Sequence, residues 1–171
     1  MNDRIYFTAL HMPLIIAEPP GIMSGMKILA TNKRGRFDYE ITEKLIAGIE
    51  LTGAEVKSIK AGHISLKGSF VAFRGIEGYL TNAHVSPYKY AALAAEDEPT
   101  RSRRLLMHKK ELERLSGLKT QGLSVIPLAV GLQRNLIKIE LGIGRGKKMY
   151  DKRATMQKRD VERDMARKLS R

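Results

Sequence analysis

Two stretches near the end of the chain, residues 123–132 and 135–143, constrain the fold most, because both carry the pattern of β-strands. In the second stretch an apolar side alternates with a side that carries Lys138 and Glu140. Alternation with a period of two residues is typical of a strand that is buried on one face. Only Gln133 and Arg134 separate the two stretches, so we expect them to form an antiparallel β-hairpin.

Shorter strand patterns precede this hairpin. We expect strands at residues 36–51, with a bend near Gly48, and at 69–74, 78–85 and 103–107. A hairpin loop at 75–78 would join the second and third of these segments. Short strands at regular spacing favour a small barrel or a sandwich. The predicted fold is mainly β with short helices, arranged as a small antiparallel barrel of the oligonucleotide-binding (OB) type.

Two short helices interrupt the strands. Thr52 and Glu55 stand three residues apart before an apolar pair, which is a capping-box pattern and predicts a helix over residues 53–60. Gly62 would stop this helix. A second helix is expected over 108–115, with Gly117 ending it.

The chain divides into three parts by composition. Residues 26–144 hold the predicted strands and form the expected OB-like barrel. Residues 1–25 are nearly uncharged, contain several prolines and show no sustained period, so we expect a disordered or loosely attached extension. Translation from Met23 or Met26 would remove most of it. Residues 145–171 form a basic C-terminal tail.

The tail has a distinct chemistry. Eleven of its 27 residues are Lys or Arg and four are Asp or Glu. Gly144 and Gly146 are expected to break the last strand, and Thr155 is expected to cap a helix that runs to Leu169. The apolar stripe of this helix is narrow, so we expect a tail that is disordered alone and folds on its partner. A membrane-surface helix is the rival interpretation of a basic amphipathic segment.

The charge of the chain indicates a polyanionic partner. The formal net charge is +13, and cations are clustered in both the body and the tail. Such clustering is typical of nucleic-acid binding, in which phosphate contacts supply most of the affinity. Only 6% of the residues are aromatic and none is Trp, so we do not expect base stacking to be the main mode of binding.

Other classes of function find little support. There is no Cys, and the four His residues are scattered, which argues against a zinc site or any other metal site. No catalytic constellation, cofactor motif or membrane span is recognisable, so a cytoplasmic, non-enzymatic protein without a cofactor is expected. An enzyme acting on nucleic acid would need metal-binding acids, and the group at 96–98 lies in one predicted loop. A general single-strand-binding module remains the main alternative.

Several residues are candidates for direct contact with RNA. Arg101 and Arg103 would lie on one face of an extended strand, and arginine can bind phosphate with two parallel hydrogen bonds. Leu105 and Leu106 would alternate, so one of them must be partly exposed beside these arginines. The full set of predicted RNA contacts is Lys33, Arg34, Arg36, Lys57, Lys60, Arg101, Arg103, Arg104, Leu106, His108, Lys147 and Lys148.

Four blocks, in this order, resemble the bacterial SsrA-binding protein (small protein B, SmpB) family. The blocks are Asn32-Lys-Arg-Gly-Arg36, Ala47-Gly-Ile-Glu-Leu-Thr-Gly-Ala-Glu-Val-Lys-Ser-Ile-Lys-Ala-Gly62, Pro99-Thr-Arg-Ser-Arg-Arg-Leu-Leu-Met-His108 and Gly146-Lys-Lys-Met-Tyr-Asp-Lys-Arg153. The resemblance covers residues 26–171. It departs from the family pattern at Ile46, where members often carry Glu.

The resemblance implies an OB barrel and a role in ribosome rescue. Family members bind the tRNA-like domain of transfer-messenger RNA (tmRNA) and deliver it to stalled ribosomes for trans-translation, which tags the unfinished peptide. It implies elongation factor Tu as a further partner in delivery, and we expect a monomer. It also implies that the tail reaches the decoding centre and the empty mRNA channel, through Tyr150, Asp151, Lys152, Arg153, Lys158, Arg159 and Arg163.

Overall fold

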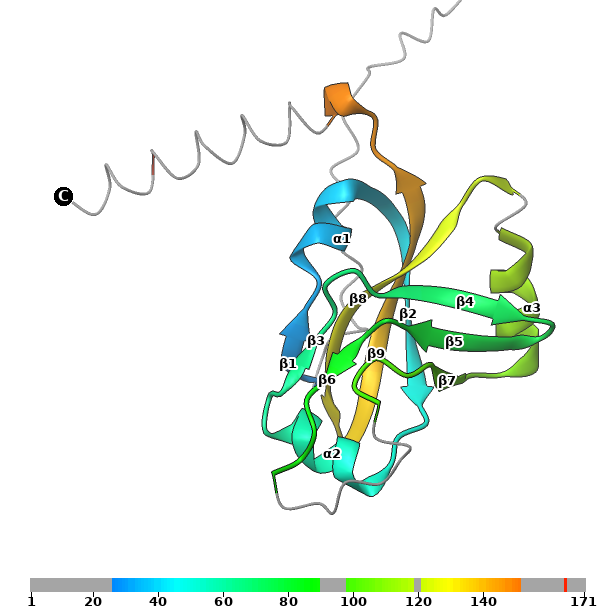
Figure 1. The fold of residues 1–171 in the computed structure, drawn as a ribbon. Coiled ribbons are helices and arrows are strands. Elements are labelled where there is room, and N and C mark those ends of the chain that lie inside the picture. Colours follow the sequence, from blue (N-terminus) through cyan, green and yellow to red (C-terminus); the bar gives the residue numbers. More distant parts are fainter. Residues whose placement is uncertain (1–25, 90–97, 119–120, 152–164, 166–171) are drawn as a thin grey trace, which may run out of the picture.

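Antiparallel strands dominate the computed structural model, which describes residues 26–89, 98–118, 121–151 and 165 (Figure 1). A seven-stranded sheet has the order β1-β8-β9-β2-β7-β5-β4. Its strands are β1 (Lys27–Thr31), β2 (Tyr39–Ile49), β4 (Phe70–Arg74), β5 (Glu77–Thr81), β7 (Arg103–Leu106), β8 (Ser124–Gln133) and β9 (Leu136–Gly146). A separate pair joins β3 (Ile64–Ser65) to β6 (His84–Val85). The prediction of a mainly β fold is confirmed.

The sheet bends across itself but is not closed into a barrel. β1 and β4 stand at the two ends of the strand order and do not pair with each other in the described part of the chain. The hairpin of β4 and β5 crosses in front of the long strands β8, β9 and β2 (Figure 1). The antiparallel sheet is therefore as predicted, whereas a barrel with a continuous ring of hydrogen bonds is not.

The predicted hairpin of the two long strands is present as β8 and β9. Arg134 and Asn135 form its two-residue turn with φ values of 48° and 63°, the left-handed backbone that such turns require. The expected break at Gly144 is wrong, because β9 continues to Gly146 alongside β2. A side chain at Gly144 would collide with the backbone carbonyl of Glu40, so glycine permits close pairing here.

Two helices agree with the sequence analysis. Helix α2 (Gly53–Lys60) has both hydrogen bonds of the predicted capping box, between Thr52 and Glu55. Gly62 follows it with a φ of 86°. Helix α3 (Lys109–Leu118) runs through Gly117, which was expected to end it. Leu112 and Leu115 of α3 are buried, and the helix continues past Gly117 to Leu118.

Helix α1 (Lys33–Asp38) was not predicted, and it takes the place of the start of the strand expected at 36–51. The buried side chain of Asn32 accepts a hydrogen bond from the Gly35 amide at 2.9 Å and donates one to the Pro127 carbonyl at 3.0 Å. A Cβ at Gly35 would approach Ile126 to within 2.9 Å, so α1 packs closely on β8. These contacts join residues about 95 positions apart, and no local pattern predicts them.

The short strands β1 and β3 were not predicted either. The expected strand 78–85 is divided into β5 and β6 at Asn82, whose φ is 58°. The core lies between the bent halves of the sheet, and its buried apolar residues include Ile59, Leu80, Leu105, Ile139 and Leu141. No helix of the described residues is long and apolar enough to cross a membrane.

The predictions for the two ends of the chain lie largely outside the described residues. This applies to the extension at 1–25 and to the helix expected over 155–169. Met26, the first described residue, is buried and lies against Gly131 of β8.

Candidate nucleic-acid interface

The predicted RNA contacts fall at four separate places on the fold. One group lines a groove beside β7, a second is drawn into the interior around Glu55, a third lies on α2, and a fourth surrounds α1 and the end of β9. The described surface is therefore not one continuous basic stripe, and each place has its own geometry.

The groove beside β7 brings together Arg104, Leu106 and His108. It has a volume of about 640 Å³ and is also lined by Ile46 of β2 and Lys138 of β9. Leu106 is 48% exposed while its neighbour in the strand is buried, which confirms that one leucine of this pair faces solvent. An exposed leucine between cations offers apolar contact to a ribose or base inside a site that attracts phosphate.

Arg104 lines this groove, and its side chain is about half exposed. Its guanidinium forms ion pairs with Glu50 at 3.2 Å and with Glu77 at 3.1 Å, and all three side chains are well exposed. Exposed ion pairs contribute little to stability, so a phosphate can replace these carboxylates at small cost. His108 precedes α3, and its backbone amide donates to Glu111 while its side chain stays exposed.

Arg101 and Arg103 point to one side, as predicted, but that side is the protein interior. Both bind the buried carboxylate of Glu55: Arg101 Nε and Arg103 Nε each lie 2.8 Å from Glu55 Oε1. Arg103 is only 1% exposed and also donates to the carbonyls of Ala83 and Pro99. The prediction that Arg103 touches RNA is therefore corrected, because its donors are used to join α2 to β7.

Glu55 is the centre of this network. The sequence pattern predicted a role for Glu55 only in the capping box of a helix. Burial by itself raises the pKa of Glu55, but the hydrogen bond from Arg101, the bond from the Thr52 amide and the charge of Arg103 together hold that pKa below its ordinary value. The carboxylate is thus kept ionised between two arginines. The pairing of acids with arginines far along the chain gives no signal in a single sequence.

Lys57 and Lys60 lie on the exposed side of α2, as the helix prediction implied. The Lys57 ammonium is 5.5 Å from the centre of the Tyr88 ring, a cation–π contact. In Figure 1, α2 stands at the end of the molecule opposite to α1. A ligand bound at α1 would therefore be remote from these two lysines.

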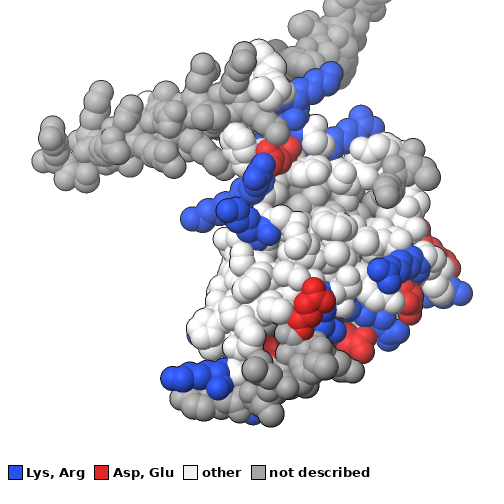
Figure 2. Space-filling model, in the orientation of Figure 1, with Lys and Arg blue, Asp and Glu red and all other residues white. Residues whose placement is uncertain are grey.

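The fourth place is a basic cap formed where α1 meets the end of β9. The amide of Lys147 donates to the carbonyl of Asp38 at 2.8 Å, which holds the two segments together. Figure 2 shows Lys and Arg side chains gathered at this end of the molecule. The cap consists of Lys33, Arg34, Arg36, Arg145, Lys147 and Lys148.

Two arginines of the cap differ in their freedom. Arg34 is 77% exposed and has an ion pair with Asp38 one helical turn away, at 3.3 Å. Arg36 is partly exposed and donates to the buried Glu140 at 3.0 Å. Lys44 lies 3.9 Å from the other oxygen of Glu140, which accepts no hydrogen bond from the described residues. Arg36 is therefore held by its ion pair with the buried Glu140, whereas the exposed Arg34 can turn toward a ligand.

The root of the predicted tail leaves from this cap. A helical turn begins at 149–151, and the Lys148 amide donates to the Asp151 carboxylate at 3.1 Å. Tyr150 is 81% exposed, so its ring is available for stacking. The remaining predicted ribosome contacts, Lys152, Arg153, Lys158, Arg159 and Arg163, lie outside the described residues.

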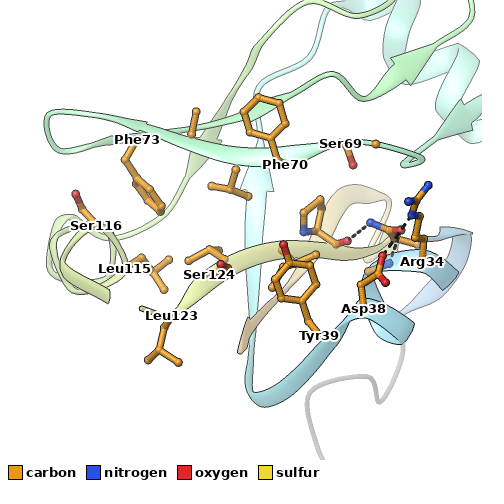
Figure 3. Close-up of a pocket in the computed structure, with 18 residues that line it drawn as sticks. Arg34, Asp38, Tyr39, Ser69, Phe70, Phe73, Leu115, Ser116, Leu123 and Ser124 are labelled. Carbon is orange, nitrogen blue, oxygen red and sulfur yellow. Dashed lines mark hydrogen bonds and ion pairs between the residues drawn. The ribbon is translucent and has the colours of Figure 1, made fainter. Parts of the chain in front are cut away.

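A second hollow lies between β4, α1 and the start of β8 (Figure 3). Its volume is about 530 Å³, and Tyr39, Ser124, Phe73 and Leu115 contribute to its walls. It was not predicted from the sequence. Within the described ranges, no group of three or more His, Asp or Glu residues is arranged to hold a metal ion.

Comparison with known proteins gives a consistent result. The model of the SmpB protein family matches residues 29–171. An "SsrA-binding protein" of Synechococcus sp. (strain JA-2-3B'a(2-13)) is 47% identical over 145 residues, which is 84% of this chain and 94% of that relative. An "SsrA-binding protein" of Chloroflexus aggregans (strain MD-66 / DSM 9485) is 43% identical over 145 residues, with 84% and 92% covered.

A solved structure is also similar. It belongs to the work described as "tmRNA-SmpB: a journey to the center of the bacterial ribosome". The two chains share 43% of their sequence with a TM-score of 0.58, and the match covers 73% of this chain and 86% of the other.

Proposed function

Since the chain belongs to the SmpB protein family, we propose that it is an RNA-binding adaptor that binds the tRNA-like domain of tmRNA and delivers it to stalled ribosomes for trans-translation. The observation that carries this proposal is the similarity to SsrA-binding proteins over nearly the whole of their length. The protein acts by binding, without catalysis or a cofactor, in the cytoplasm. Elongation factor Tu joins the delivery complex, and the adaptor works as a monomer.

The body, residues 26–144, holds the folded RNA. The groove beside β7 makes the central contacts through Arg104, Leu106 and His108, because this is where exposed apolar and cationic groups converge in a concave surface. The bent, open sheet serves as a partly open barrel of the OB type. Folded RNA is bound largely by shape and by phosphate contacts, which suits a body with few aromatic residues.

The basic cap and the tail face the ribosome. The cap lies at a different place from the groove beside β7, so two different RNAs can bind to the protein at the same time. Tyr150 is exposed at the root of the tail, where it can stack on an unpaired base of the decoding centre. The basic residues that follow enter the mRNA channel when no message fills it, and they become helical there.

The test is a comparison of two RNAs at physiological ionic strength. The purified protein is titrated with the tRNA-like domain of tmRNA and with a random duplex of equal length, and binding is followed by fluorescence anisotropy. Several-hundredfold preference for the tRNA-like RNA is expected. Equal affinity for both, or stronger binding of a poly-U strand, would sink the proposal and favour a general single-strand-binding module.

The division of labour between body and tail has its own test. Deleting residues 155–171 is expected to leave the affinity for the tRNA-like RNA nearly unchanged and to abolish peptide tagging in a reconstituted translation system. A deletion that weakens RNA binding as much as it harms tagging would show that the two parts do not act separately.

A further inference from the structure

The outward face of β4, β5 and β7 carries aromatic side chains that the proposed function has not used. Strand register pairs Phe70 with Thr81, Ala72 with Tyr79, and Tyr79 with Arg104. Residues paired in this way lie on the same side of a sheet, and diagonal neighbours are within reach of aromatic rings. Phe70 and Tyr79 are diagonal neighbours, so their rings share one surface.

This surface faces solvent. Phe70 is 50% exposed, and Figure 3 shows it leaving β4 on the side opposite to Phe73, which points toward Leu115. In Figure 1, β4 and β5 lie at the front of the molecule with no helix drawn over them. Figure 2 shows the same view: uncharged atoms cover this part of the surface, and charged side chains gather at one end of it.

Tyr79 is held in a fixed position on this face. Its hydroxyl donates to Glu77 Oε2 at 2.6 Å, and Glu77 is held in turn by Arg104. The guanidinium of Arg74 lies 5.3 Å from the centre of the Tyr79 ring. A ring that is fixed before binding loses little conformational entropy when a ligand stacks on it.

The aromatic face is continuous with the groove beside β7. Glu77 and Arg104 line that groove and also border Tyr79. Ile76, at the turn between β4 and β5, is 51% exposed and lines the groove as well. An RNA held in the groove by Arg104 and Leu106 therefore has the partly buried ring of Tyr79 directly beside it, and the exposed ring of Phe70 lies on the same face.

We propose that the aromatic face, consisting of Phe70, Arg74 and Tyr79, is a stacking platform for unpaired bases of the RNA held in the groove beside β7. The proposal rests on the proposed function, because it assigns to that RNA a single-stranded segment next to the groove. Every base has a flat apolar face, so aromatic residues on an open sheet accept bases of any sequence. Arg74 and Arg104 then bind the phosphates on either side.

The aromatic face bears on the expectation, drawn from composition, that base stacking is not the main mode of binding. Few aromatic residues argued against stacking as the main mode of binding, but two rings on one face beside a phosphate-binding groove are enough to hold two bases. The carboxylates of Glu50 and Glu77 partly neutralise Arg104 in the free protein, and they are exposed ion-pair partners that phosphate can displace.

The experiment uses the full chain and a hairpin RNA whose unpaired loop contains 2-aminopurine, with a fully paired duplex of equal length as the second probe. Phe70→Ala is compared with Phe70→Tyr, which keeps a ring, and Tyr79→Leu with Tyr79→Phe. We expect each loss of a ring to weaken binding of the looped RNA about tenfold, the order found for one stacked base. Both ring-keeping variants bind nearly as the parent does.

The looped probe also reports stacking directly. Quenching of 2-aminopurine on binding is expected with the parent chain and is lost in Phe70→Ala. Circular dichroism spectra and urea midpoints of all variants are measured first, and only variants that keep the spectrum and the urea midpoint of the parent are compared. Phe70 is half exposed, so Phe70→Ala meets this condition, and Tyr79→Phe keeps the partly buried ring.

Three results would overturn the platform: equal weakening for looped RNA and duplex, no quenching in the parent, or unchanged affinity in Phe70→Ala. The first would indicate a general electrostatic or structural effect. Failure of the proposed function looks different, since the parent chain would then show no preference for the tRNA-like domain over a random duplex, whatever residue stands at 70.

Discussion

Replacing Glu55 by glutamine removes the charge that joins α2 to β7. In the folded protein Glu55 accepts bonds from the Thr52 amide at 2.9 Å and from Arg101 and Arg103 at 2.8 Å each. Glutamine has nearly the same shape, so no cavity forms. The substitution leaves the buried Arg103 without its opposite charge, and it also replaces one accepting oxygen by an NH2 group that faces N–H donors.

The expected cost follows from this burial. Removing one partner of a buried ion pair typically destabilises a protein by about 3–5 kcal/mol, because the other charge stays in a medium that solvates it poorly. For a chain of this size that corresponds to a fall in melting temperature of roughly 10 °C. Replacing Glu43 by glutamine is the matched control, since its ion pair with Arg114 is exposed. The control should cost no more than about 0.5 kcal/mol.

The assay is urea denaturation followed by far-ultraviolet circular dichroism, repeated between pH 7 and pH 3. The folded-state pKa of Glu55 lies below its ordinary value of 4.5. A carboxylate with a lowered folded pKa contributes stability above its unfolded pKa and loses that contribution as the pH falls through the folded value. The difference between Glu55→Gln and the parent should thus be full at pH 7 and shrink below about pH 4.5.

Equal destabilisation by Glu55→Gln and Glu43→Gln would refute the reasoning. So would a difference between parent and Glu55→Gln that does not change with pH. Either result would mean that the arginine network contributes no more to folding than an exposed ion pair does.

Other substitutions test the packing of β9, the groove beside β7 and the basic cap. Gly144→Ala should lower the unfolding free energy by about 2 kcal/mol or more, because the new Cβ collides with the neighbouring strand. Gly117→Ala in α3, where a Cβ meets nothing, should raise the unfolding free energy by about 0.5–1 kcal/mol. Urea titration measures both changes. Leu106→Ala should weaken binding of the tRNA-like RNA in anisotropy titrations and leave stability unchanged, while Leu105→Ala should cost about 2–5 kcal/mol of stability. Lys33→Ala should make the plot of log affinity against log salt shallower by about 0.7–0.9 if this lysine binds one phosphate, and an unchanged slope would remove it from the interface.

Local chemistry determined which parts of the fold were predictable. The α2 helix was anticipated with its bounds, because Thr52 and Glu55 form the whole capping signal within four residues. The hairpin of β8 and β9 was anticipated from two adjacent strand patterns, of which the second alternates. Helix α1 was missed because the residue that fixes it, Asn32, binds a carbonyl on β8 that is distant in sequence. The end of β9 was misplaced because Gly144 serves close pairing there and not chain termination.

The candidate site was also predictable only where local sequence patterns determine it. Alternation placed Arg101 and Arg103 on one side of β7, but it could not say which side is the interior. The exposure of Leu106 was expected from the pair of leucines, since only one of two neighbours can face the core. The shared face of Phe70 and Tyr79 depends on the register between β4 and β5, which no single segment contains.

The long pairing of β9 with β2 and β8 has a mechanical consequence. The chain beyond Asp151 is attached to the end of β9, and β9 runs antiparallel to both neighbours for most of its length. A pull on that end along the strand acts in shear, so many hydrogen bonds of two ladders resist it together and none can be peeled away singly. The two ladders of β9 are thus arranged to keep the sheet intact under tension applied to the residues that follow this strand.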